Sequence, residues 1–250
     1  MNANQLKLKV IACKVMAREL AMVSWNCKNT LDITTIRQKY HDVPVKLRDL
    51  LQAEIDRIES GNDPYTNEED DFDAIILGYG LCSNAVAGLR SKKYKLVIPR
   101  AHDCTTIFLG SKEKYSQVFL KYKGTYFYNR SWAELLPDQG EDLLRKKYQE
   151  YMEQFEDEDT VDYLMEMEKN MLAHYNNAAY ITWPEIEDEE YKDIIKDMAK
   201  EKNWNYIELE GSSDLLYRLV NGDWNEEDFL VVEPGQTVVN TGDEDIIDVE

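Results

Sequence analysis

Three apolar segments of this chain each run into a loop that carries a cysteine. The cysteines are Cys13, Cys82 and Cys104. The segments are residues 6–13, which end at Cys13 itself, and residues 72–77 and 94–98, which precede Cys82 and Cys104. Short apolar runs bounded by turn residues are typical of strands that are buried on both faces of a sheet. The pattern therefore predicts a buried sheet with a cysteine at or just past the end of three strands.

The segments between these strands have helical patterns, which set the fold class. Residues 15–24 are rich in Ala, Met and Leu at helical spacing, and Pro44 opens an amphipathic helix that ends near Gly61. Residues 85–89 have the composition of a further helix. Helices between strands imply crossover connections and parallel pairing. We therefore predict an α/β fold with a mostly parallel, Rossmann-like sheet and flanking helices.

The chain divides by pattern into four parts. Residues 1–135 form the predicted N-terminal α/β half, which carries the cysteines. Residues 136–177 are dense in Glu, Asp, Lys, Met and Leu, which predicts a long acidic helical segment in the middle of the chain. Residues 178–239 repeat the β-α-β pattern, and either extend the first sheet or form a second α/β lobe. Residues 240–250 are an acidic tail, which we expect to be largely disordered.

The balance of charge excludes some classes of partner. The chain has 29 Lys and Arg against 49 Asp and Glu, a formal net charge of −20. Such a field repels phosphate backbones, so we expect no nucleic-acid partner. No apolar run approaches the ~20 residues that span a membrane, and residues 1–9 lack the pattern of a signal peptide. We therefore expect a cytoplasmic protein, without a membrane partner, whose cysteines stay reduced.

The three strand-end cysteines are the candidate metal site. Ligands of open α/β sheets bind beyond the carboxyl ends of the strands, so Cys13, Cys82 and Cys104 converge if their strands are neighbours. Three thiolates suit a zinc ion or, as the alternative, an iron–sulfur cluster. His102 is a candidate fourth ligand; otherwise that position stays open for a small-molecule substrate. The competing interpretation is three buried apolar residues, because free cysteine is commonly buried and no Cys-x-x-Cys spacing is present.

The loop around Cys104 also holds the candidate catalytic residues. His102 is one of only three histidines, and Asp103 follows it directly. A histidine with a neighbouring carboxylate can act as a general base. Side chains of adjacent residues in an extended segment point to opposite sides, however, so Asp103 need not be the partner of His102. Cys27 has no strand-end position, and we interpret it as structural.

The loop after the second strand is a candidate for cofactor binding. Two glycines separated by one residue permit a tight turn where a ligand or metal can approach the backbone, but they do not make a dinucleotide fingerprint. Arg100 either clamps an anionic group or pairs with one of the many carboxylates. The predicted cofactor-binding residues are Gly78, Tyr79, Gly80, Asn84 and Arg100.

Several motifs resemble the domain-of-unknown-function 1638 family over nearly the whole chain. They are residues 78–84, 99–104, 108–111, 222–224, 229–232 and 234–235. Members of that family occur in anaerobic bacteria and methanogenic archaea, often beside corrinoid proteins and methyltransferases for methylamines, methanol or betaines. The resemblance implies a place in cobamide-dependent one-carbon metabolism, with a corrinoid protein or a methyltransferase as partner. It does not imply a reaction.

Together these observations give one hypothesis and two rivals. The hypothesis is a zinc-dependent methyltransferase, in which thiolate-bound zinc prepares an accepting thiol while a cobamide on a partner protein presents the methyl group. The first rival is a non-catalytic accessory protein that binds a corrinoid protein or its cofactor. The second is an iron–sulfur enzyme that uses the same cysteines.

Overall fold

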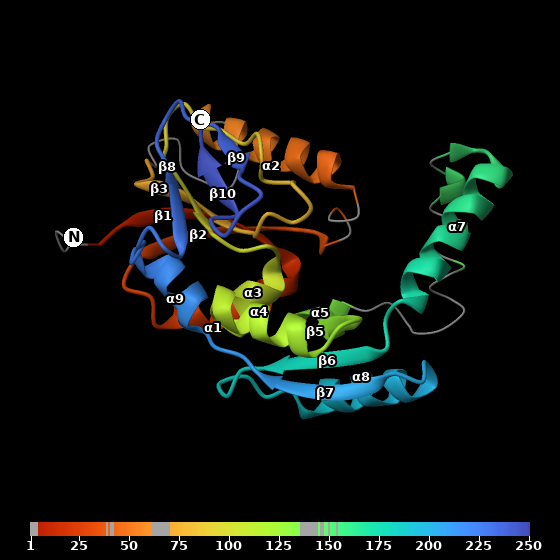
Figure 1. Cartoon of the computed structure of the whole chain (residues 1–250). Helices are drawn as coiled ribbons and strands as arrows, with labels where there is room; N and C mark the ends of the chain where they lie inside the picture. Colours follow the sequence, from red (N-terminus) through yellow and green to blue (C-terminus); the bar gives the residue numbers. More distant parts are fainter. Residues whose placement is uncertain are drawn as a thin grey trace. The chain divides into compact units, whose positions relative to one another are not determined.

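The computed structural model describes residues 5–38, 40, 43–61, 71–135, 145, 148–149, 151–153 and 155–250 (Figure 1). The chain forms two compact units. Unit 1 consists of Met1–Ser116 and Glu210–Glu250, and unit 2 of Gln117–Leu209. Unit 1 is therefore made from two separate stretches of sequence. The division predicted from the sequence, at residues 135, 177 and 239, remains a prediction.

Unit 1 contains a five-stranded sheet in the order β2-β1-β3-β4-β8. The strands are β1 (Lys7–Cys13), β2 (Thr30–Ile36), β3 (Ala74–Gly78), β4 (Leu96–Pro99) and β8 (Phe229–Val232). The first four strands are mutually parallel, and β8 pairs antiparallel with β4. Every residue of β3 and β4 is buried, as expected of parallel strands covered on both faces. The predicted α/β fold with a mostly parallel sheet is confirmed.

Helices flank this sheet. They are α1 (Ala17–Trp25), α2 (Pro44–Glu59), α3 (Cys104–Leu109), α4 (Lys112–Lys121), which crosses the unit boundary, and α9 (Asp214–Asn221). A short 3-10 helix, η1 (Lys14–Met16), joins β1 to α1. Pro44 begins α2 as predicted, because its missing N–H and fixed φ suit the first turn. Figure 1 shows α2 on one side of the sheet and α1 and α9 on the other.

Two local predictions for unit 1 are wrong. Residues 85–89 form turns instead of a helix, because left-handed residues precede them and Gly88 has φ +93°. The acidic tail is ordered: β9 (Val238–Asn240) and β10 (Ile247–Val249) pair antiparallel. Ile246 and Ile247 are buried there in the core of unit 1, which offsets the cost of ordering the acidic residues around them.

Unit 2 contains a separate three-stranded sheet in the order β5-β6-β7. The strands are β5 (Thr125–Tyr128), β6 (Asn177–Thr182) and β7 (Asn205–Glu210), and the helices are α5 (Arg130–Leu135), α7 (Glu158–Ala173) and α8 (Glu189–Glu201). The core of unit 2 consists of aromatic and aliphatic side chains from its strands and its helices, such as Tyr128, Tyr180 and Ile195. The later β-α-β pattern thus divides, because β6 and β7 join this sheet while β8 joins the first.

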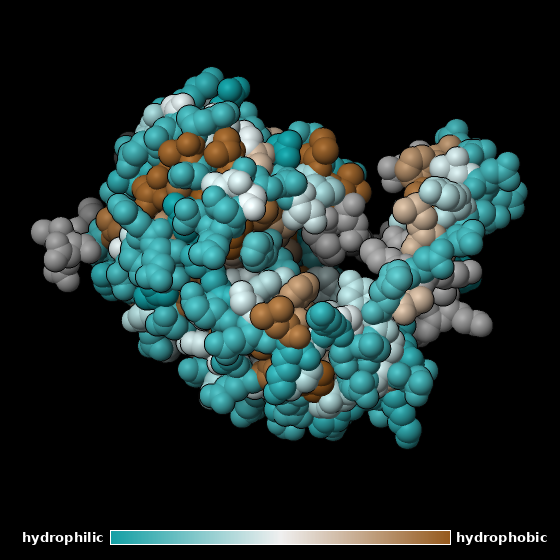
Figure 2. All heavy atoms as spheres, viewed as in Figure 1, coloured by the Kyte–Doolittle hydropathy of each residue, from teal (hydrophilic) through white to brown (hydrophobic). Residues whose placement is uncertain are grey.

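The predicted helical segment of residues 136–177 is seen only in part. The helix α7 lies within it, whereas residues 136–144, 146–147, 150 and 154 lie outside the described residues. Over the described part of the chain, no helix combines the length and apolar character needed to cross a membrane. Figure 2 shows a mostly hydrophilic face, with hydrophobic atoms over the strands that Figure 1 labels β8, β9 and β10.

Candidate functional site

The three cysteine-bearing strands are neighbours. β3 lies between β1 and β4, and both pairs are parallel, so the carboxyl ends of the three strands meet at one edge of the sheet. The strand order also reverses here, because β2 lies on one side of β1 and β3 on the other. Ligands of open α/β sheets bind at such switch points. Cys13 ends β1 and Tyr79 follows β3, so these two residues flank the switch point of unit 1.

Backbone hydrogen bonds join the loop after β3 to the loop after β4. The amide of Leu81 donates to the carbonyl of Ala101 at 2.7 Å, and the amide of Cys82 donates to the carbonyl of His102 at 2.9 Å. Gly80 permits this approach, because a β-carbon there would lie 2.7 Å from the Ala101 oxygen. The two loops therefore hold Cys82 and the start of α3, where Cys104 lies, close together.

The thiols of Cys13, Cys82 and Cys104 interact electrostatically with one another, and we call these residues with Tyr79 the thiol cluster. Burial raises the pKa of Cys13 to about 11 and that of Cys82 to about 12, and it raises the pKa of Cys104 well above 9.0. Backbone N–H groups oppose these shifts, those of Gly80 and Cys104 acting on Cys82. The three thiols thus share one place in the fold and are neutral at physiological pH without a ligand.

The phenol of Tyr79 lies near all three thiols of the thiol cluster, each of which acts on it electrostatically. Only 2% of the residue is exposed, and its hydroxyl has no hydrogen-bond partner among the described residues. Burial raises the pKa of this phenol, and the three thiols raise it further. A buried hydroxyl without a partner costs about 1–3 kcal/mol, and such groups in folded proteins are few. The hydroxyl therefore marks a position where a bound group would supply the missing acceptor.

The residues from Cys82 to Asn84 form a left-handed turn, which we call the Cys82–Asn84 turn. Their φ angles are +45°, +55° and +71°. Residues other than glycine visit this region singly and at a cost, so three in succession are unusual. Strain of this kind collects at functional sites. The sequence did not signal this turn, because none of the three residues is glycine.

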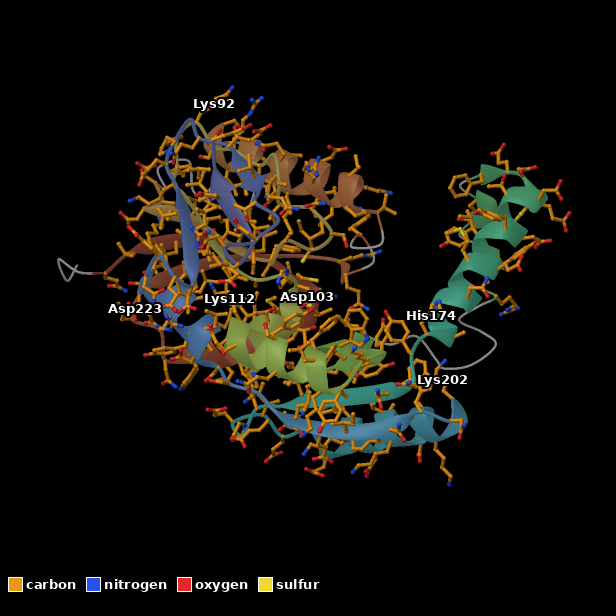
Figure 3. The ribbon with its side chains drawn as sticks, viewed as in Figure 1. Lys92, Asp103, Lys112, His174, Lys202 and Asp223 are labelled. Carbon is orange, nitrogen blue, oxygen red and sulfur yellow. The ribbon has the colours of Figure 1, made fainter. Side chains whose placement is uncertain are left out.

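Asp103 begins α3 beside the thiol cluster. Its carboxylate caps the helix by accepting from the amides of Thr105 at 2.9 Å and Thr106 at 3.4 Å. The hydroxyl of Tyr115 donates to its other oxygen at 3.4 Å. Burial raises the pKa of Asp103, and these hydrogen bonds oppose the shift. Figure 3 shows Asp103 at the start of α3. Tyr115 was not among the predicted residues, since nothing in its sequence position marks it.

The other predicted residues differ in how they relate to the thiol cluster. His102 is exposed, and its ring centroid lies 5.8 Å from that of Tyr115. Gly78 fits against β1, because a β-carbon there would lie 2.7 Å from that of Ala12. Cys27 donates its thiol hydrogen to the carbonyl of Val220 at 3.3 Å, which fits the structural role predicted for it.

Arg100 and Asn84 direct their side chains to other partners. The guanidinium of Arg100 donates to the carbonyls of Glu226 at 3.0 Å and Asp245 at 3.0 Å, and also to that of Ile247. The side-chain oxygen of Asn84 accepts from the amide of Asn240 at 2.5 Å. The hydrogen bonds of Arg100 thus go to backbone carbonyls, while its positive charge also helps to lower the pKa of the Asp243 carboxyl. Both side chains hold the segment after β8 instead.

The donor atoms of the thiol cluster suit a soft metal ion, because thiolate sulfur is the ligand that zinc and iron–sulfur clusters favour. The Tyr79 hydroxyl, which has no acceptor among the residues that the structure describes, also fits a bound group. In the part of the chain that the structure describes, however, no three Cys, His, Asp or Glu side chains are gathered as a ready metal-binding group. The chemistry of the cluster thus fits a metal, and its sulfur atoms would have to approach one another to bind it.

Unit 2 has a cavity of about 600 Å³ beside the start of α8. Its lining comes from Arg130 and from residues 182–184 and 186–192. Both of its cations are already paired: Arg130 contacts Glu134 at 3.0 Å, and Lys192 contacts Asp188 and Glu189. The sequence analysis did not single out this segment. Its mixture of paired charges does not favour one class of ligand.

A family model described as a protein of unknown function (DUF1638) matches residues 35–220. No curated protein and no solved structure shows a significant match to the chain. The matched residues include Tyr79, Cys82 and Cys104, and the match begins after Cys13. The late motifs at residues 222–235 lie outside it, so the match is shorter than the resemblance predicted from the sequence.

Proposed function

We propose that this chain, which belongs to the domain-of-unknown-function 1638 family, binds a zinc ion at the thiol cluster and acts in corrinoid-dependent one-carbon metabolism. The observation that carries the proposal is the buried hydroxyl of Tyr79, which lies among three thiols without a hydrogen-bond partner in the described residues. A protein gains stability when a ligand satisfies such a group. The sulfur atoms around it make a thiophilic metal the ligand of choice.

The position in the sheet supports the same assignment. The thiol cluster lies at the switch point of the parallel strands, where α/β proteins bind ligands. We include in the proposal that unit 1 is Rossmann-like, because its four parallel strands follow the doubly wound order 2-1-3-4, with a switch point between β1 and β3. We also propose that residues 136–177 form the acidic helical segment, of which α7 is the described part.

The strain of the Cys82–Asn84 turn supports a ligand as well. Three left-handed residues in succession are maintained only if surrounding contacts or a bound group compensate for their cost. The Cys82 sulfur follows the backbone of this turn, so the turn sets where that sulfur lies relative to the other two thiols. We propose Cys13, Cys82 and Cys104 as the metal ligands, with His102 as a candidate fourth.

A bound zinc ion supplies Lewis acidity, which lowers the pKa of a thiol or water that it holds. The residues of the chain then have separate tasks. Tyr79 Oη donates a hydrogen bond to the accepting thiol and orients it. An Asp103 carboxylate oxygen accepts the proton of that thiol, while Tyr115 and the first amides of α3 position the carboxylate. The thiolate sulfur would then take a methyl group from a methylcobamide on a partner protein: the S–C bond would form as the Co–C bond breaks, with the electron pair of that bond left on the cobalt. The family resemblance implies the corrinoid partner, and the transfer itself is part of this proposal.

Metal and sulfide analysis of anaerobically purified protein tests the proposal. The variants are Cys82→Ser and Cys104→Ser, and Cys27→Ser is the matched control. We expect about one zinc ion per chain in the wild type and in the control, and a loss in the other two variants. Iron with sulfide, lost in the same variants, would replace zinc with an iron–sulfur cluster. A wild-type protein that holds no metal after incubation with zinc or iron would refute the metal site and favour the accessory protein.

A further inference from the structure

We propose that the C-terminal hairpin, residues 237–250, holds the Cys82–Asn84 turn in its left-handed conformation and thereby positions the Cys82 sulfur. None of the site residues predicted from the sequence lies in this hairpin. The inference goes beyond the proposed function and rests on it only where metal affinity is the readout.

The turn has few bonds of its own. Its internal hydrogen bond runs from the Ala85 amide to the Cys82 carbonyl at 3.1 Å, and the Cys82 amide bonds to His102. Each left-handed residue that is not glycine costs about 1–3 kcal/mol. A single internal bond, worth about 0.5–1.5 kcal/mol, is too weak to balance three such residues. Contacts from other elements must therefore maintain the turn.

Two of these contacts meet at Asn84. A guanidinium nitrogen of Arg48, on α2, donates to the Asn84 carbonyl at 2.6 Å. The side-chain amide of Asn240, at the end of β9, donates to the Asn84 side-chain oxygen at 2.5 Å. The residue with the largest φ angle in the turn is thus held from both sides, by a helix and by the hairpin.

The hairpin is itself firmly attached to unit 1, so it can act as a support. Val238 exchanges backbone hydrogen bonds with Gly88 at 2.7 Å and with Leu89 at 2.9 Å. Ile246 and Ile247 are 3% and 0% exposed. Arg100 donates to two carbonyls of the hairpin from the end of β4. The hairpin therefore connects the strand edge, the core and the turn that carries Cys82.

The test measures the rate at which iodoacetamide alkylates Cys82 in metal-free full-length protein, with Cys27 followed as an internal reference. Asn240→Ala removes the contact to Asn84, together with the acceptor of the Gly242 amide inside the hairpin. We expect it to raise the rate at Cys82 about five- to tenfold, because the turn opens more often. Asp248→Ala, an exposed substitution on the same hairpin, is the matched control and should leave the rate within about twofold of wild type.

Two substitutions of Asn84 distinguish the loss of the hairpin contact from the backbone strain of the turn. Asn84→Ala loses the contact and places alanine at φ +71°, so it should increase the Cys82 rate at least as much as Asn240→Ala. Asn84→Gly loses the same contact but adopts this φ without strain, and should restore a slower rate. Equal rates for Asn240→Ala and Asp248→Ala would overturn the proposal. So would a rise at Cys27 equal to that at Cys82, because the opening would then be global.

Zinc affinity gives the second readout. If the metal site exists, Asn240→Ala should weaken zinc binding by about the same factor as it increases alkylation. A wild-type protein that binds no zinc would refute the proposed function, while the alkylation rates would still decide whether the hairpin supports the turn. A zinc affinity equal to wild type, with faster alkylation, would show that Cys82 is supported by the hairpin and is not a ligand.

Discussion

Gly80 approaches Asp103 so closely that a β-carbon at Gly80 would lie 2.8 Å from the backbone nitrogen of Asp103. No Cβ atom tolerates that separation from a backbone atom, so the loop after β3 and the start of α3 can lie together only while residue 80 lacks a side chain. This contact brings Cys82 beside Cys104.

Gly80→Ala should therefore separate the two loops. We expect a loss of about 1–3 kcal/mol in the free energy of unfolding, because the atoms in the way belong to the backbone. Faster alkylation of Cys82 should accompany it. Gly235→Ala is the control: open space surrounds that position, and only its φ of +93° opposes alanine, at about 1–2 kcal/mol, so this variant should lose stability without changing the Cys82 rate. Denaturant titration checks both values, and an unchanged Cys82 rate in Gly80→Ala would contradict the prediction.

Tyr79→Phe should stabilise the metal-free protein or leave its stability unchanged. The substitution removes a buried hydroxyl that has no partner in the described residues, and with it a desolvation cost of about 1–3 kcal/mol. Tyr94→Phe should do the opposite, because the hydroxyl of Tyr94 donates to Asp71 at 2.8 Å. Thermal unfolding of both variants without metal shows whether the Tm of each one rises or falls relative to wild type. Destabilisation of Tyr79→Phe would mean that its hydroxyl already has a partner.

Arg100→Ala should lower stability by about 2–3 kcal/mol, since the charged guanidinium donates to three backbone carbonyls. Arg90→Ala is the control, because the hydrogen bonds of Arg90 use its backbone. Anion titration gives an independent measure. Sulfate that stabilises the wild type but not Arg100→Ala would instead support the anion clamp considered from the sequence.

Lys192→Met should change the pH dependence of stability in unit 2. Burial raises the pKa of Asp188 above 3.8, and Lys192 opposes the shift from 3.2 Å. A carboxyl with a raised folded pKa binds its proton more tightly in the native state, so its contribution increases as pH falls through that pKa and is complete below 3.8. Without Lys192 the pKa should rise further.

Urea unfolding from pH 7 to pH 4 measures this change. Lys192→Met should cost about 1–3 kcal/mol at pH 7, and the difference from wild type should shrink toward pH 4. Lys196→Met is the control, because both side chains in each of its ion pairs, with Asp193 and with Glu208, are exposed, so these pairs should contribute little at any pH. A constant difference across this pH range would show that Asp188 is not the group that responds.

Local patterns predicted the local elements well. The helix from Pro44 and the strand at residues 229–232 lie where the sequence places them, because hydrophobic spacing and a proline at the first turn specify them directly. The helix predicted at residues 85–89 was wrong, because contacts with the hairpin, remote in sequence, determine the conformation there. The hairpin was missed for the same reason. Its isoleucines are buried against a sheet formed by residues far away in the sequence, so the local pattern of residues 237–250 does not reveal this burial.

The site was predictable up to the ends of the strands. Each cysteine position followed from an apolar segment, but the order of the strands depends on non-local pairing, so only the structure places β3 between β1 and β4. The partners of Arg100 lie 126 to 147 residues further along the chain, a range at which sequence spacing carries no information. Tyr115 reaches Asp103 through the turn between α3 and α4, which no pattern marked.

The interrupted sequence of unit 1 also has a consequence for the order of synthesis. Translation completes unit 2 before it supplies β8 and the hairpin, because residues 117–209 lie between the two stretches of unit 1. Until residues 237–250 leave the ribosome, the turn that bears Cys82 has no Asn240 to hold it. The nascent protein thus passes through a stage in which the hairpin does not yet support this thiol. A metal ion that bound at that stage would bind a loop whose conformation is not yet fixed.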